Sequence, residues 1–185
     1  MDLYSARLHI RPVLPSDADS LFDIYGDPAT NLFNPAGPYL DLVYAKKVLS
    51  LWLTHWDTHG FGNYAIALQS APAAVIGFGG LSFHTYAGMT IHNLGYRFAV
   101  SAWGKGLATE FARRILDYGF TDLQFAEISA VARANHTDSQ NVLMKVGMDF
   151  IQVIPDTGDA PPRWLYTLTA DQWRRGQSSY SPAVC

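Results

Sequence analysis

The stretch that decides the fold of this chain is Val100-Ser101-Ala102-Trp103-Gly104-Lys105-Gly106-Leu107-Ala108-Thr109-Glu110. An apolar, strand-like segment ends at Val100, two glycines follow within three positions, and a helical pattern begins at once. In that helix the apolar positions 107, 108, 111, 112, 115 and 116 recur at helical spacing and predict one buried stripe. We expect Glu110 and Arg114 to pair on its surface, because they stand four residues apart in the favourable order.

The two glycines before the helix allow an anion-binding site. Glycine lets the backbone approach a ligand closely, and the positive end of the helix dipole favours an anion such as a pyrophosphate. Taken alone, the pair is more typical of a tight connection with no ligand. The stretch is not a P-loop, because Lys105 lies between the glycines, and not a Rossmann fingerprint, because Thr109 stands where a third glycine is needed.

The residues on both sides of this stretch predict a mixed α/β protein. Ser16-Asp17 supplies an N-cap for a helix that ends before Gly26, and a second helix fits residues 41–55. The apolar set of that second helix is Val48, Leu49, Leu51, Trp52 and Trp56. The predicted strands are residues 7–12, 64–68, 74–84, 91–100, 126–132, 150–154 and 163–168, and the other predicted helices are residues 107–120 and 138–146. This order predicts a mostly antiparallel sheet with helices on both faces.

Composition is typical of one globular domain, with 49% hydrophobic and 16% charged residues in 185. We expect a single domain over residues 1–176, a loop over 155–162 and a flexible tail over 177–185. A formal net charge of −3 without a long run of Lys and Arg argues against a nucleic-acid partner. No apolar run approaches the roughly 20 residues that cross a bilayer, and Cys185 is the only cysteine. We therefore expect a cytoplasmic protein with no intrachain disulfide and no membrane partner.

Two stretches together resemble the GNAT superfamily of N-acetyltransferases, and specifically its RimJ/RimL-like branch. Gly95-Tyr96 is followed by residues 103–110, which match the branch's Trp-Gly-Lys-Gly-Tyr-Ala-Thr-Glu except that Leu107 replaces the tyrosine. Residues 135–148 resemble the branch's Asn-x-x-Ser segment and its closing Lys-x-Gly-Met. Here Asn135 lies four residues before Ser139 instead of three, and His136 takes the family's asparagine position. The likeness extends from about Arg7 to Leu168.

The resemblance implies a splayed sheet with coenzyme A between two parallel strands. Backbone groups of residues 98–100 would meet the pantetheine arm, residues 104–109 would hold the pyrophosphate, and Lys105 or Arg113 would meet the remaining phosphate charge. The implied cofactor-binding residues are Phe98, Ala99, Val100, Trp103, Gly104, Lys105, Gly106, Leu107, Ala108, Thr109, Asn135 and Ser139. Asparagine is also a common helix cap, which is the alternative role for Asn135.

The implied activity is transfer of an acetyl group from acetyl-CoA to an amine by direct attack in a ternary complex, without a metal. The acceptor would be a small-molecule amine or a protein N-terminus, and the protein a monomer or homodimer. Ser139 is the candidate acid for the sulfur of coenzyme A, with a capping or lining role as the alternative. Asn93 replaces the usual glutamate base, and strand alternation points His92 to the other face. His84 has a suitable intrinsic pKa for the base, or is an ordinary surface residue.

Early aromatic residues fall in or near the part that forms the acceptor pocket in the family. Residues 31–39 are the expected loop over that pocket. The aromatic side chains, expected mostly in the core with one or two in the pocket, are Phe33, Tyr39, Tyr44, Trp52 and Trp56. The substitution at Asn93 also leaves open a catalytically silent acyl-CoA sensor or partner-binding module, and transfer to a hydroxyl group is a third possibility.

Overall fold

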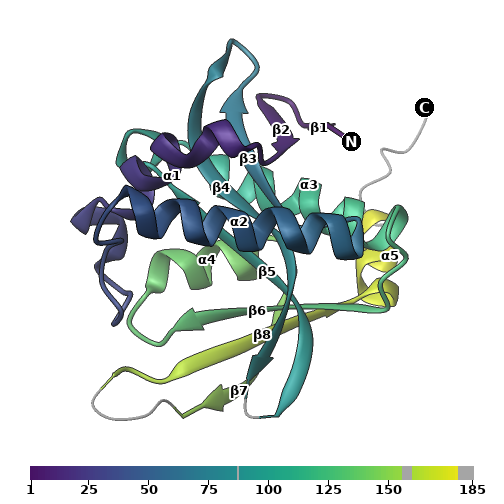
Figure 1. The fold of residues 1–185 in the computed structure, drawn as a ribbon. Coiled ribbons are helices and arrows are strands. Elements are labelled where there is room, and N and C mark those ends of the chain that lie inside the picture. The colour runs from purple at the N-terminus through teal and green to yellow at the C-terminus, as the bar shows by residue number, and fades with distance from the viewer. Residues whose placement is uncertain (87, 156–159, 179–185) are drawn as a thin grey trace.

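The structure is a computed structural model that describes residues 1–86, 88–155 and 160–178. Its centre is an eight-stranded sheet with the order β1-β2-β3-β4-β5-β6-β8-β7 (Figure 1). The strands are β1 (Leu3–Tyr4), β2 (Leu8–Pro12), β3 (Asn63–Leu68), β4 (Ala71–Tyr86), β5 (Met89–Phe98), β6 (Glu127–Arg133), β7 (Asp149–Ile154) and β8 (Arg163–Thr169). All neighbours pair antiparallel except β5 and β6, which run parallel.

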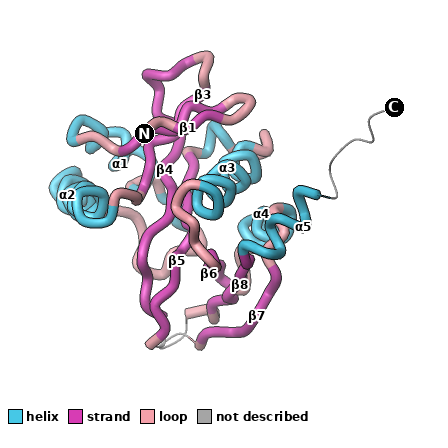
Figure 2. The backbone as a smooth tube through the Cα atoms, turned by 90° about the vertical axis from the view of Figure 1, so that its right-hand side faces the viewer, coloured by secondary structure: helices cyan, strands magenta, loops and turns pink. Residues whose placement is uncertain are grey.

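Helices cover both faces of this sheet. Figure 2 shows α1 and α2 on one side of it and α3 and α4 on the other. The helices are α1 (Ala18–Tyr25), α2 (Leu42–His59), α3 (Leu107–Thr121), α4 (Thr137–Lys145) and α5 (Ala170–Ser178), and the 3₁₀ turns are η1 (Pro15–Asp17), η2 (Pro28–Asn31) and η3 (Val100–Ala102). The predicted mixed α/β class and its mostly antiparallel sheet are confirmed.

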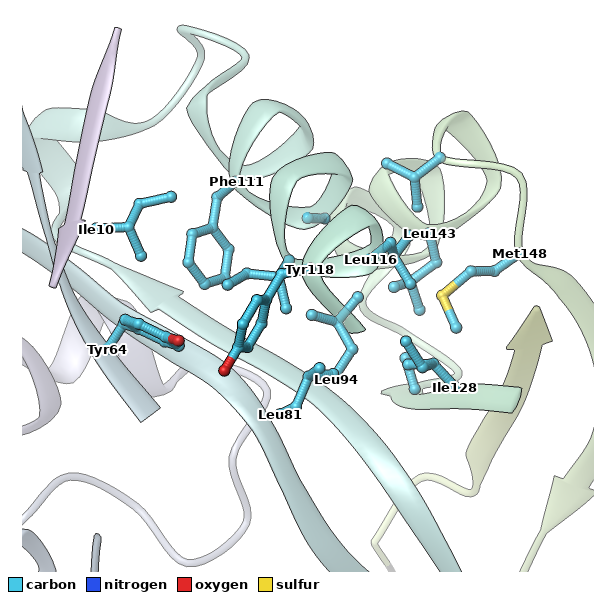
Figure 3. Packing of buried hydrophobic residues seen from close by; sticks show 14 of the residues in the cluster. Ile10, Tyr64, Leu81, Leu94, Phe111, Leu116, Tyr118, Ile128, Leu143 and Met148 are labelled. Atoms are coloured by element: carbon cyan, nitrogen blue, oxygen red, sulfur yellow. The ribbon is translucent and has the colours of Figure 1, made fainter. Parts of the chain in front are cut away.

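The larger core lies between the sheet, α3 and α4 (Figure 3). The predicted stripe of α3 is buried there, with Phe111, Ile115 and Leu116 fully inside. Each such side chain stabilises the fold by about 2 kcal/mol relative to exposure to water. A smaller core on the opposite face packs α1 and α2 against Phe78 of β4. The sheet is therefore held from both sides.

The sheet opens between its two parallel strands. Asn93 of β5 and Ser129 of β6 are the one registered pair between them in the described residues. Beyond this pair, residues 94–98 continue along β4 and residues 130–133 continue along β8. The two strands therefore diverge toward their C-terminal ends, as the resemblance implies.

Several local predictions are wrong in detail. Asp17 is the N-cap residue of α1, as predicted, but its side chain makes no capping hydrogen bond, because its carboxylate is buried in a bidentate ion pair with Arg11 and accepts a hydrogen bond from the Leu14 N–H. Helix α2 continues to His59, and Leu51 on it is exposed instead of buried. Arg114 contacts Tyr4 and Asp117 instead of Glu110. The partners that replace the predicted ones lie both nearby, as Arg11 and Asp117 do, and far away in the sequence, as Tyr4 does.

The C-terminal end carries a helix that the sequence does not predict. Helix α5 includes residues 177 and 178, which fall in the expected tail. Residues 179–185 and residues 156–159 of the expected loop lie outside the described residues. The division into a domain over 1–176 and a tail over 177–185 stays a prediction.

Candidate active site

A cavity of about 730 Å³ lies where β5 and β6 diverge. Its walls come from η2 and the loop after it, β5, the glycine turn with the start of α3, β6, and α4. The predicted site residues that line it are Phe98, Trp103, Gly104, Gly106, Leu107, Ala108, Thr109 and Ser139. One cavity thus joins the glycine turn to Ser139, which lies more than thirty residues further along the chain.

The glycine turn leaves the N-terminus of α3 without a side-chain cap. Gly104 and Gly106 have φ angles of +71° and +74°, in the left-handed region that favours glycine. Gly106 is the N-cap residue of α3, so no side-chain oxygen satisfies the first N–H groups of the helix. Within the described residues, no protein acceptor takes the N–H groups of Gly104, Lys105 and Gly106. This arrangement of donors and helix dipole fits an anion such as a diphosphate.

A network from the N-terminal strand fixes the shape of this turn. Glu110 accepts hydrogen bonds from the Ser5 hydroxyl and the Arg7 N–H, each at 2.7 Å. Its other oxygen pairs with the Arg7 guanidinium, which also donates to the Lys105 carbonyl at 2.9 Å. Burial raises the pKa of Glu110, but these hydrogen bonds and the Arg7 charge outweigh it and hold the pKa below the ordinary 4.5. The turn is thus braced from residues about a hundred positions away.

The strand edge next to the turn is largely satisfied within the chain. The Phe98 carbonyl accepts from the Trp103 indole N–H at 3.0 Å, and the Ala99 N–H donates to the Ile76 carbonyl. The Val100 carbonyl accepts from the Trp103 N–H. Ala99 and Val100 are not among the residues that line the cavity. Residues 98–100 can therefore make the predicted contacts with a pantetheine arm only if Trp103 moves. Otherwise other backbone groups must form hydrogen bonds with that arm.

The two predicted phosphate-binding cations point elsewhere. The Lys105 ammonium donates to the Ser101 carbonyl at 2.8 Å, and its side chain lines a second cavity of about 570 Å³ beside Arg7. The Arg113 guanidinium donates to the Lys145 carbonyl. Neither lines the main cavity, whereas Lys145 itself does. In this structure the turn presents backbone N–H groups, not these side chains, to the cavity.

Ser139 has a partner that the sequence did not reveal. Its hydroxyl lies 3.5 Å from the phenol oxygen of Tyr96, and both residues line the cavity. Burial raises the pKa of Tyr96 to about 12, although the hydrogen bond with Ser139 opposes the shift. Tyr96 therefore stays a protonated phenol near neutral pH, and either hydroxyl can be the donor in this pair.

The β6–α4 connection brings His136, not Asn135, to the cavity. The buried Gln140 side chain donates to the Arg133 and Ala134 carbonyls and fixes this connection. The His136 ring stacks on Phe33, with 4.1 Å between ring centres, and both residues line the cavity. Asn135 is exposed, lies outside the lining, and is not the N-cap of α4, which is His136.

Burial lowers the pKa of His136, and the Arg97 charge adds to this effect against the opposing charge of Asp138. Its neutral, proton-accepting form is therefore favoured.

The structure does not bring His84 to the cavity. His84 is exposed near the far end of β4, where it stacks beside Tyr86. His92 also points away, because its ring stacks on Phe125 at 3.8 Å. Asn93, by contrast, lines the cavity and is only 8% exposed, and its side-chain oxygen has no hydrogen-bond partner within the described residues. That oxygen is a buried, unsatisfied acceptor.

Comparison with known proteins decides the family. The profile of the acetyltransferase (GNAT) domain matches residues 7–149. The chain belongs to the GNAT acetyltransferase family. A relative known as the uncharacterised N-acetyltransferase p20 of Bacillus licheniformis is 28% identical to this GNAT protein over 141 residues, which cover 76% of this chain and 78% of p20.

Solved structures share the fold. A GNAT-family acetyltransferase from Bacillus anthracis superposes with a TM-score of 0.76 at 22% identity, covering 92% of this chain and 99% of that one. RimJ of Mycobacterium smegmatis, solved in complex with CoA-disulfide, gives a TM-score of 0.71 at 20% identity, covering 97% and 94%. At these identities the two neighbours show that the fold is shared.

Within the described part of the chain, no three His, Cys, Asp or Glu side chains gather in a way that could hold a metal ion. In residues 1–86, 88–155 and 160–178, every helix is too short or too polar to span a bilayer.

Proposed function

We propose that the protein transfers the acetyl group of acetyl-CoA to an amine by direct attack in a ternary complex. One observation carries this proposal. The uncapped N-terminus of α3, with its left-handed Gly104 and Gly106, opens into the same cavity as Ser139 and His136. An anion-binding turn and two proton-transfer groups in one cavity fit a phosphorylated acyl donor and an acceptor whose amine must lose a proton.

The glycine turn is the proposed site for the diphosphate of acetyl-CoA. Its N–H groups and the helix dipole attract the anion without a side-chain cation. The brace from Arg7 and Glu110 keeps the turn in this shape before the ligand arrives, which reduces the entropy cost of binding. Lys145 at the cavity wall supplies a nearby positive charge.

The reaction forms an amide bond and breaks the thioester C–S bond. The neutral amine attacks the thioester carbon, the C–S bond breaks, the amine nitrogen loses a proton, and the departing thiolate gains one. Ser139, hydrogen-bonded to the protonated phenol of Tyr96, is proposed to protonate the thiolate. His136, neutral and held by Phe33, is proposed to receive the proton from the amine. The cavity itself holds both reactants together, which lowers the barrier further.

The test is a coupled measurement of binding and turnover. The protein is titrated with coenzyme A by calorimetry and then incubated with acetyl-CoA and a panel of small amines and peptides while thiol release is followed. We expect coenzyme A binding and amine-dependent thiol release, with an amide product identified by mass. If no coenzyme A binds at millimolar concentration, the proposal is wrong.

The same measurement separates the two alternatives. Tight coenzyme A binding with no turnover on the whole panel would support an acyl-CoA sensor and contradict catalysis. A product cleaved by hydroxylamine would be an ester and would indicate a hydroxyl acceptor.

A further inference from the structure

Arg97 lines the cavity from the side that faces α1 and η2. Side chains alternate along a strand, so Asn93 and Arg97 of β5 share one face, and Tyr96 and Phe98 share the other. Tyr96 and Phe98 contact Phe111 of α3. Arg97 instead contacts Tyr25 of α1. Its charge therefore lies on the opposite face of the sheet from the glycine turn that begins α3.

The Arg97 guanidinium is held rigidly by two contacts. It donates to the Asn31 side-chain oxygen at 2.6 Å and lies 4.3 Å from the ring centre of Tyr25. Asn31 is itself buried, and its amide donates to the Tyr25 and Asp27 carbonyls at 2.8 Å each. The end of α1 and the 3₁₀ turn η2 thus fix the direction of this side chain. A fixed guanidinium can present its remaining N–H donors to a ligand with little further loss of entropy.

No carboxylate neutralises Arg97 within the described residues, because none of their ion pairs includes it. Only one of its five N–H donors makes a protein hydrogen bond in the same residues. The other charged groups that line the cavity are Arg133, Lys145 and Asp138. Among these residues, Arg97 gives the acceptor side a cation with free donors within the described part of the chain.

A second polar group on the same face is suited to an amine. Asn93 stands four residues before Arg97 on β5, and its buried oxygen has no protein partner. Gly95 lies between them on the same face and adds no side chain, and the Asn93 amide nitrogen lies 3.4 Å from where a Cβ on Gly95 would stand. An amide oxygen accepts a hydrogen bond from an amine N–H, whereas a guanidinium binds a carboxylate through two parallel hydrogen bonds.

We propose that Arg97 binds a carboxylate of the acceptor while Asn93 accepts a hydrogen bond from its amine, so that the acceptor is a small amino-acid-like molecule. This inference rests on the proposed function, because it assigns the acceptor side of that cavity. The juxtaposition of the fixed, unpaired guanidinium and the unpartnered amide oxygen on one face of β5 carries it. The positive charge of Arg97 disfavours a polycationic amine as the acceptor.

The experiment compares matched ligands that differ only in the carboxylate. Protein saturated with coenzyme A is titrated by calorimetry with N-acetylglycine, N-acetylmethionine, N-acetylphenylalanine and N-acetylaspartate, and with the corresponding carboxamides. These compounds are products of the proposed reaction and do not react further. For at least one pair we expect the carboxylate to bind about 10- to 100-fold more tightly than its amide, the range expected for hydrogen bonds to charged groups.

Three variants test whether Arg97 causes this preference. In Arg97→Gln the preference should fall to about one. In Arg97→Lys it should fall only in part, because an ammonium keeps the charge but loses the planar fork. Lys47→Gln on the exposed surface of α2 removes the same charge outside the cavity and should keep the full preference.

Two results would overturn the proposal. The first is equal affinity for acid and amide throughout the panel, or no binding of either, in the protein that binds coenzyme A. The second is a preference that survives in Arg97→Gln. Failure of the wild-type protein to bind coenzyme A would instead contradict the proposed function. Coenzyme A affinity measured for each variant shows that its fold and cofactor side are intact.

Discussion

The two sides of the cavity are built in opposite ways. The side proposed for the cofactor is a continuous segment, residues 103–109, with backbone N–H groups at the start of α3. The side proposed for the acceptor is assembled from side chains of separate elements, among them Phe33, Arg97 and His136, and Asn31 holds Arg97 in place. The first needs glycines and a helix, whereas the second needs particular side chains brought together by the fold.

This difference indicates which amino-acid substitutions each side of the cavity can tolerate. Backbone donors are the same for every residue, so the cofactor side depends on backbone shape and little on side-chain identity. Side-chain groups on the acceptor side define the charge and size of the ligand, so single substitutions there change specificity. Fold alone therefore does not fix the acceptor. The predictions below test this division, beginning with the largest effect.

Gly106→Glu should lower the affinity for coenzyme A by about 100-fold or more. A carboxylate at the N-terminus of α3 repels a diphosphate, and a side chain strains the left-handed backbone. The measurement is calorimetric titration with coenzyme A. Gly60→Glu is the matched control, since Gly60 has a φ of +73° and open space around it at the end of α2. Unchanged affinity in Gly106→Glu would mean that the turn does not hold the phosphates.

His136→Gln should lower kcat by about 100-fold, a typical contribution of a general base. The pKa of His136 lies below its ordinary 6.5, so its proton-accepting form persists at neutral pH and is lost only as the pH falls through that lowered pKa. The wild-type rate should therefore decline on the acid side below pH 6.5, and this limb should vanish in the variant. If His84→Gln abolishes turnover and His136→Gln does not, the base is the histidine that the sequence suggested.

Ser139→Ala should lower kcat by about tenfold without changing coenzyme A affinity, because it interrupts proton delivery to the thiolate. Tyr96→Phe should have a similar or smaller effect, and the double variant should lose less than the product of the two because the residues act as a pair. The pKa of Tyr96, about 12, predicts no tyrosine limb between pH 6 and 9. Ser50→Ala on the exposed side of α2 is the control, and additive losses would show that the two hydroxyls act separately.

Glu110→Gln should weaken coenzyme A binding only a few-fold and lower the free energy of unfolding by about 1 kcal/mol, because it removes charge-assisted hydrogen bonds to Arg7. The lowered pKa of Glu110 means that this stability is present above pH 4.5 and is lost as the pH falls through the lower, folded-state value. Melting temperatures of wild type and variant should therefore converge in acid. Asp117→Asn on the same helix, outside the network, is the control, and an equal loss of affinity there would exclude a role of the brace.

The sequence predicted most of the elements that position the site. Helix α3 and the glycine turn were predicted closely, because helical periodicity and glycine preference are encoded by residues near one another. The ends of the predicted strands agree with the structure to within three residues, and the two-residue strand β1 was not predicted. Helix α5 was missed because its residues are mostly polar, and its Trp173 is packed against Phe120 of α3 only in the folded chain.

Side-chain roles were predicted less well than elements. The choice between Asn135 and His136 depends on how the β6–α4 connection turns, which Gln140 fixes through two carbonyls. The pairing of Glu110 with Arg7 spans 103 positions, so local charge spacing wrongly favoured Arg114. No spacing rule connects Tyr96 with Ser139, which are 43 positions apart.

The sequence alone was enough for the fold class, the family resemblance and the glycine turn before α3, because each depends on local patterns and on their order along the chain. The folded chain was needed to show which histidine reaches the cavity, what braces the turn, and that Arg97 has no carboxylate partner among the described residues. These features depend on where β5 and β6 separate and on which residues the helices then bring to the gap. Such contacts join residues from distant parts of the chain, and no local pattern specifies them.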